Sequence, residues 1–196
     1  MAYLLDANVL IEAKNQHYGM DFCPAFWRWL SDSHADGQVF SVVEVRDELT
    51  DPEISPWVAV QSPGFFLPTD PEVVGARHSI ELWARDMQFT REAVRGFMKS
   101  ADSALIAFAV AHGHAVVTME RSSGSKRKVK IPDVCKDFNV RCIKPHIMLR
   151  ELRARFVLGS LHEPYEGATL ARVDPDVQTA ADSQESLLCW IPTGTA

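Results

Sequence analysis

Short apolar runs alternate along the chain with longer segments in which apolar residues recur every three or four positions. The short runs are typical of buried strands, and the longer segments are typical of amphipathic helices. Strands are predicted at residues 2–5, 38–41, 114–118 and 141–143, and helices at 24–36, 42–51, 71–87, 91–98, 101–112, 132–138 and 145–155. This alternation indicates the α/β class, and we expect a three-layer α/β/α sandwich with a central, mostly parallel sheet.

Several helix ends carry a local signal. Pro24 suits the first turn of a helix, Thr90 and Ser100 suit N-cap positions, and Gly113 suits the residue that ends a helix. Residues 41–44, Ser-Val-Val-Glu, fit a capping box in which the last side chain reaches back to the first backbone amide.

The character of the chain changes near residue 157. Residues 158–196 contain six acidic residues and one arginine, are rich in Gly, Pro, Ala, Thr and Ser, and lose strand or helix periodicity. We therefore predict one domain at residues 1–157 and an acidic, irregular C-terminal tail at 158–196.

Composition narrows the class of protein. The chain has 196 residues and 46% hydrophobic content, which suits one domain with a buried core. The longest unbroken apolar run, residues 104–111, is far shorter than the ~20 residues that span a bilayer. The first residues lack the basic segment of a signal peptide, so we expect a cytoplasmic protein that does not enter membranes. The four cysteines are scattered, so neither a zinc site nor a disulfide framework is expected.

The net charge of −6 does not by itself favour binding to nucleic acid. Residues 1–157 hold 20 acidic and 19 basic residues, so this part of the chain is close to neutral. If it binds RNA, local basic clusters and bound cations must offset the repulsion of phosphates.

Four acidic residues fall at the edge of the predicted sheet where ligands bind in open parallel sheets. Asp6 follows the first strand, Glu48 lies on the helix after the second, Asp102 is in the first turn of the helix behind Ser100, and Glu120 follows the strand at 114–118. Each has a structural alternative; Asp102, for example, suits the positive end of a helix dipole. Together they predict a site for Mg²⁺ or Mn²⁺, which prefer carboxylate and water ligands.

Glu44 competes with Glu48 for this role. The two residues are four positions apart and would share a helix face. The capping box gives Glu44 a structural function, so we favour Glu48 as the metal ligand, and Glu44 remains the alternative.

Residues 4–11, Leu-Leu-Asp-Ala-Asn-Val-Leu-Ile, resemble the opening motif of PIN-domain nucleases, which include VapC-type toxins. Residues 48–49, 101–107 and 118–120 resemble the later motifs of that family in the same order. The resemblance covers roughly residues 1–150 and leaves the tail aside. It departs from the family at Glu120, where the usual residue is aspartate.

The resemblance implies a metal-dependent endoribonuclease that hydrolyses single-stranded RNA with one or two Mg²⁺ or Mn²⁺ ions. Asp6, Glu48, Asp102 and Glu120 would be its catalytic and metal-binding residues. It further implies the toxin of a toxin–antitoxin pair, with an antitoxin protein as partner and a homodimeric state. Asn8 and Thr118 are candidates for orienting the metal ligands or the substrate. The structural alternatives are turn stabilisation for Asn8 and strand propensity for Thr118, and for Thr118 the alternative has at least equal weight.

A basic loop follows Glu120 directly. Arg121, Lys126, Arg127 and Lys128 lie in it and are candidates for binding RNA phosphates, with a solvated loop as the alternative.

Two other functions compete with the toxin-like ribonuclease. One is a structure-specific nuclease that processes RNA or DNA, and the other is a catalytically inert PIN-like module that binds partners. The complete set of four acids argues against the inert module.

Overall fold

The computed structural model describes residues 1–156, which form one compact unit; the tail predicted at 158–196 lies outside the described residues. Within this part, one sheet contains β1 (Tyr3–Leu5), β2 (Val39–Val42), β3 (Phe66–Leu67), β4 (Ala115–Val117) and β5 (Cys142–Ile143). The strand order is β3-β2-β1-β4-β5, and every neighbouring pair is parallel. The predicted α/β class is confirmed.

The order of the strands reverses between β1 and β4. From β1 the chain adds β2 and β3 on one side, and then returns to add β4 and β5 on the other. Leu5 pairs with Val117, so β1 and β4 end at the same level. Ligands of open parallel sheets bind outside the carboxyl ends of the strands at such a reversal.

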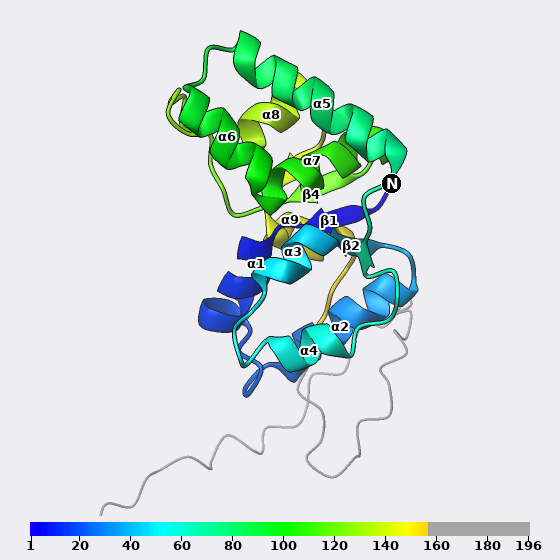
Figure 1. The fold of residues 1–196 in the computed structure, drawn as a ribbon. Coiled ribbons are helices and arrows are strands. Elements are labelled where there is room, and N and C mark those ends of the chain that lie inside the picture. The colour runs from blue at the N-terminus through cyan, green and yellow to red at the C-terminus, as the bar shows by residue number, and fades with distance from the viewer. Residues whose placement is uncertain (157–196) are drawn as a thin grey trace, which may run out of the picture. The chain divides into compact units, whose positions relative to one another are not determined.

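Helices cover the sheet on both sides (Figure 1). The described helices are α1 (Ala7–Glu12), the π-helical η1 (Ala13–His17), α2 (Pro24–Ala35), α3 (Val43–Glu48), α4 (Ser55–Ala59), α5 (Pro71–Asp86), α6 (Arg91–Lys99), α7 (Ala101–His112), α8 (Ile131–Asp137) and α9 (Pro145–Glu151). Helix α7 packs against β1, β2 and β4 and is itself covered by α5 and α6, while α2 and α4 lie on the other side of the sheet.

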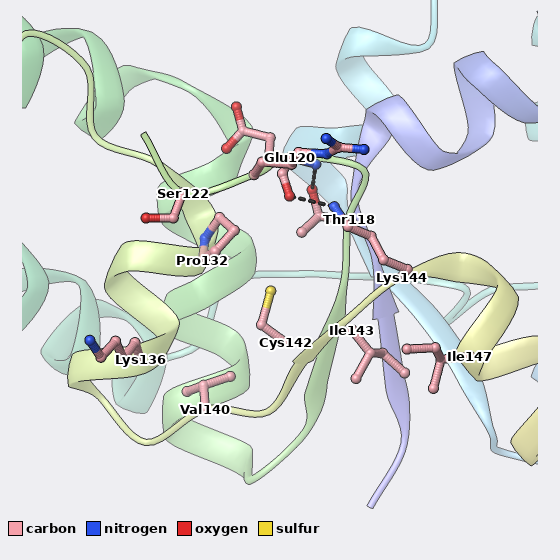
Figure 2. A pocket seen from close by; sticks show the side chains of 11 residues that line it. Thr118, Glu120, Ser122, Pro132, Lys136, Val140, Cys142, Ile143, Lys144 and Ile147 are labelled. Atoms are coloured by element: carbon pink, nitrogen blue, oxygen red, sulfur yellow. Dashed lines mark hydrogen bonds between the residues drawn. The ribbon is translucent and has the colours of Figure 1, made fainter. Parts of the chain in front are cut away.

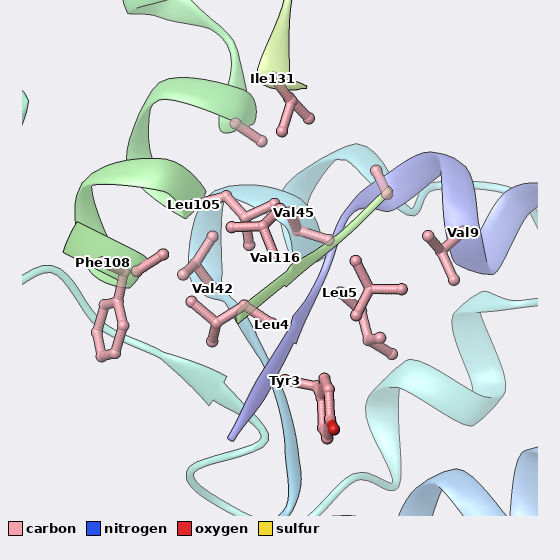
Figure 3. Close-up of a cluster of buried hydrophobic side chains, with 14 of the residues drawn as sticks. Tyr3, Leu4, Leu5, Val9, Val42, Val45, Leu105, Phe108, Val116 and Ile131 are labelled. Atoms are coloured by element: carbon pink, nitrogen blue, oxygen red, sulfur yellow. The ribbon is translucent and has the colours of Figure 1, made fainter. Parts of the chain in front are cut away.

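The core surrounds α7 and the two central strands. Leu4, Leu105 and Val116 are all 0% exposed and belong to one cluster of buried side chains (Figure 3). Burying a side chain of this size stabilises the fold by about 1.5–3 kcal/mol. The elements that carry or precede the predicted acids therefore rest on this buried core.

Most predicted elements are present within a few residues of their expected ends. The side chain of Thr90 accepts a hydrogen bond from the Ala93 amide, which confirms it as the cap of α6, and Gly113 adopts φ 68° where α7 ends. Four short elements were not predicted, namely α1, η1, α4 and β3. None of them exceeds six residues, which is too short for periodicity to identify.

The predicted capping box is wrong. Ser41 belongs to β2, where its amide donates to the Phe65 carbonyl at 2.8 Å and its hydroxyl donates to the Leu5 carbonyl at 2.7 Å. Helix α3 begins only at Val43, and Glu44 instead accepts a hydrogen bond from the Thr69 hydroxyl at 2.9 Å. Pairing of strands therefore takes precedence over the local cap.

No helix within residues 1–156 combines the length and the apolar character needed to cross a membrane.

Candidate functional site at the carboxyl edge of the sheet

Asp6 lies at the centre of the edge where the strand order reverses. It is 1% exposed, and its amide donates to the Val117 carbonyl at 3.0 Å, which continues the pairing of β1 with β4. Its Oδ2 accepts a hydrogen bond of 2.7 Å from the Thr118 hydroxyl. Burial raises the pKa of Asp6, and the Thr118 hydroxyl and the Asn8 amide oppose that rise by stabilising the carboxylate.

Asp102 stands in the first turn of α7, beside the end of α3. Its pKa is raised to about 7, first by burial and then by the negative charges of three other acids, which are Asp6, Glu120 and Glu48. The nearby Lys128 opposes this rise. The charges of the other three predicted acids therefore all act on Asp102.

Glu48 joins α3 to α7. Its Oε1 accepts a hydrogen bond of 3.1 Å from the amide of Ala101, the first residue of α7. Ser100 occupies the N-cap position, but its hydroxyl donates to the Phe97 carbonyl at 2.8 Å instead of capping the helix. Glu48 thus supplies the acceptor that the first turn of α7 needs.

Glu120 is held by residues that follow it in the chain. Its Oε1 forms an ion pair with Lys130, and its Oε2 accepts a hydrogen bond of 3.0 Å from the Ile131 amide. Lys128 is 3.9 Å from the same carboxylate. The Lys144 ammonium donates to the carbonyls of Met119 and Glu120, so the backbone here is also fixed.

These carboxylates suit a divalent cation in their chemistry, since hard cations take oxygen ligands. Their arrangement is less complete, because no three His, Cys, Asp or Glu side chains among residues 1–156 are grouped so as to hold a metal ion. Glu48 faces the Ala101 amide and Glu120 faces Lys130, which leaves Asp6 and Asp102 as the acids best suited to direct ligation. The other two would act through water, or after leaving these partners.

A family model described as "Domain of unknown function (DUF4411)" matches residues 3–156. The chain belongs to the DUF4411 family. No curated protein and no solved structure matches it. The DUF4411 match includes all four acids, so the carboxylate cluster lies within the family domain and outside the tail. The description states no activity, and the resemblance to PIN-domain nucleases stays a prediction.

The remaining predicted residues of this DUF4411 chain divide into those near the acids and those away from them. Thr118 is 1% exposed, and its hydroxyl orients Asp6 by donating a hydrogen bond to it. Asn8 is exposed in α1, beside Asp6. Lys126 is turned away, with its ammonium 4.9 Å from the centre of the Phe89 ring. Arg127 is exposed, and its amide donates to the Ser125 hydroxyl.

Lys130 and Lys144 hold Glu120 in the DUF4411 domain, and the sequence prediction missed both. For Lys130 a signal existed, because Lys128 and Lys130 alternate with the buried residues Val129 and Ile131. In extended chain such alternation places the two lysines on the same side. Lys144 has no comparable signal, since its contact with the turn after β4 depends on how β5 pairs.

Proposed function

We propose that this DUF4411 chain is a metal-dependent endoribonuclease that hydrolyses single-stranded RNA. The proposal rests on four acids from separate segments near the edge where the strand order reverses, namely Asp102 and the three acids whose charges raise its pKa, Asp6, Glu120 and Glu48. Two like charges about 4 Å apart repel by about 4 kcal/mol at an effective dielectric near 20. A divalent cation would remove such a cost, which makes its binding the simplest reason for the cluster.

The chemistry follows from the residues at hand. Asp6 and Asp102 would bind Mg²⁺ or Mn²⁺ directly, and Glu48 and Glu120 would complete the site in part through water. A bound cation supplies a water of lowered pKa and neutralises charge on the scissile phosphate. Thr118 keeps the Asp6 carboxylate in one orientation through its hydrogen bond.

Basic residues beside the acids support an RNA substrate. Lys128 approaches Glu120, and Arg121 and Arg127 are exposed in the same loop. These side chains would bind phosphates and supply local positive charge, which the near-neutral domain lacks as a whole.

The narrower role, the toxin of a toxin–antitoxin pair with an antitoxin partner and a homodimeric state, is supported by the sequence resemblance alone. A structure-specific processing nuclease would use the same acids on another nucleic acid.

An inert interaction module is the second candidate. The ion pair of Lys130 with Glu120 favours it, because it already neutralises one member of the cluster without a metal. The inert module is also favoured because no three His, Cys, Asp or Glu side chains within residues 1–156 are grouped so as to hold a metal ion.

Cleavage of labelled single-stranded RNA in the presence of Mn²⁺ or Mg²⁺ tests the proposal. We expect wild type to cleave, and we expect activity to disappear in EDTA and in Asp6→Asn and Asp102→Asn proteins purified identically. Glu44→Gln is tested beside them because Glu44 is the alternative to Glu48; we expect it to keep activity, since Glu44 contacts Thr69 and is not among the charges named as acting on Asp102. Cleavage that survives both aspartate substitutions would refute this site. If wild type neither cleaves RNA nor binds Mn²⁺ in calorimetry, the nuclease proposal fails and the inert module remains.

A further inference from the structure

A second feature of this edge is a pocket of about 530 Å³ beside the acids, where β4, β5, α8 and α9 meet (Figure 2). Its apolar lining comes from Pro132, Val140, Cys142, Ile143 and Ile147. The volume falls within the range of about 300–1,000 Å³ that is usual for small-molecule sites. A planar, largely apolar ring system suits such a lining.

The polar lining of the pocket is mainly cationic. Arg121, Lys136 and Lys144 contribute to it, and Glu120 is its acid. The charge of Glu120 is already met by Lys130. Arg121 and Lys136 are exposed, and neither forms an ion pair with another side chain of residues 1–156. An anionic group on the ligand would therefore be attracted to this pocket.

The pocket and the carboxylate cluster share residues. Thr118 and Glu120 line the pocket, and the same residues hold Asp6 and repel Asp102. Figure 2 shows Lys144 reaching the Glu120 carbonyl from the side of α9, so the wall between the two features is a fixed one. A ligand in the pocket would lie next to whatever group the acids act on.

We propose that this pocket binds one nucleotide of the RNA substrate, the one adjoining the scissile phosphate. Its base packs on Pro132 and Ile143, and its phosphate lies between Arg121 and Lys136. The inference rests on the proposed function, because it takes the acids to act on a phosphodiester. Single-stranded RNA offers an unstacked base and a phosphate together, which is the combination of chemistry that the lining provides.

A free nucleoside monophosphate carries the same chemistry, so the experiment has two arms. The first measures binding of a short fluorescent single-stranded RNA to the full chain by anisotropy in EDTA, where no cleavage occurs. The second adds adenosine or uridine 5′-monophosphate as competitor. Both arms use wild type, Lys136→Glu, which reverses an exposed charge, and Ile143→Trp, which fills the pocket. Lys99→Glu on α6 makes the same charge change outside the pocket and reports the loss due to net charge alone.

We expect the two pocket variants to bind RNA about tenfold more weakly than wild type or worse, and Lys99→Glu to differ from wild type by less than about threefold. Equal RNA affinity in wild type and Lys136→Glu would overturn the inference, and this variant decides the matter if Ile143→Trp does not fold. Binding of monophosphate without binding of RNA would overturn the assignment to an RNA strand.

The outcome is separable from that of the nuclease proposal. Asp6→Asn should keep RNA binding that depends on the pocket, because Asp6 does not line it. If the pocket variants lose RNA binding but wild type does not cleave RNA, the nuclease proposal fails and the pocket remains an RNA-binding site. If wild type cleaves RNA, and both pocket variants cleave it at the same rate and with the same sequence preference, the nuclease proposal stands and the pocket assignment fails.

Discussion

The Thr118 hydroxyl donates a hydrogen bond of 2.7 Å to the Oδ2 of Asp6. The same hydroxyl oxygen accepts a hydrogen bond of 3.0 Å from the Glu120 amide. One buried side chain therefore sets the orientation of the acid that follows β1 and of the turn that carries an acid after β4. Thr118, which the sequence pattern placed at the end of a strand and which lies just after β4, thus links two parts of the candidate site.

Thr118→Val should weaken both the fold and the site. Valine keeps the shape but removes both hydrogen bonds, and leaving buried polar groups unpaired costs about 1–3 kcal/mol in the free energy of unfolding. Loss of the donor also raises the pKa of Asp6 further, so Mn²⁺ affinity should fall. Urea denaturation and calorimetry check the two effects. Thr118→Ser, which keeps the hydroxyl, should restore most of both; if it matches valine, the hydrogen bonds are not the cause.

Stability should depend on pH through Asp102. Its pKa rises from 3.8 to about 7 on folding, so between these values the folded state binds more protons than the unfolded one. The free energy of unfolding should therefore fall as pH rises from about 4 to about 7, by on the order of 1–3 kcal/mol from this residue, and should level off above that. Denaturation across this range with wild type and Asp102→Asn checks it.

Asp102→Asn removes the titrating group, so its stability should fall less over the same range and should exceed that of wild type near pH 8. An equal pH slope in the two proteins would contradict the assignment. Saturating Mn²⁺ should flatten the slope of wild type, because the cation replaces the proton.

Glu48 and Glu44 offer a matched pair of substitutions. Glu48→Gln keeps an acceptor for the Ala101 amide, so stability should change little, but it removes a charge that acts on Asp102. Mn²⁺ affinity should fall about tenfold, the order of loss usual for groups that tune a metal site. Glu44→Gln should leave the affinity unchanged, because Glu44 faces Thr69. Calorimetric titration with Mn²⁺ measures both affinities. A larger loss of affinity in Glu44→Gln than in Glu48→Gln would make Glu44 the ligand.

Lys130→Ala should raise the affinity for Mn²⁺ and lower the stability of the metal-free protein. Removing the ammonium leaves Glu120 with the Ile131 amide as its remaining close partner, apart from the more distant Lys128. The melting temperature without metal should drop, and the increase caused by Mn²⁺ should grow beyond that of wild type, since the stability added by a ligand at a given concentration rises with the logarithm of its affinity. Lys126→Ala, in the same loop but beside Phe89, is the control. An unchanged Mn²⁺ effect would mean that Glu120 does not take part in binding metal.

The layers of the fold could be predicted because α5 and α7 are long and carry clear end signals, and because the strand residues of β1 and β4 are continuously apolar. The same pattern placed the acids near one edge, since parallel strands end there, and the charges of three of them act on Asp102. What escaped prediction depends on contacts between distant segments. Ser41 lost its capping role because the Phe65 carbonyl, 24 residues away in sequence, takes its amide. Lys144 reaches Met119 only because β5 lies beside β4.

Asp6 and Glu120 are anchored in different ways, and this difference has a dynamic consequence. The Asp6 amide belongs to the hydrogen-bond ladder of the two central strands, so it should exchange with deuterated solvent only when the whole domain unfolds. The turn at Glu120 is tied to the Thr118 hydroxyl and also, through Lys144, to the start of α9 at the border of the sheet. One half of the cluster is thus as rigid as the fold itself. The position of Glu120 depends in addition on Lys130 and Ile131 at the start of α8 and on Lys144 before α9, so a shift of either segment would change its distance from Asp6.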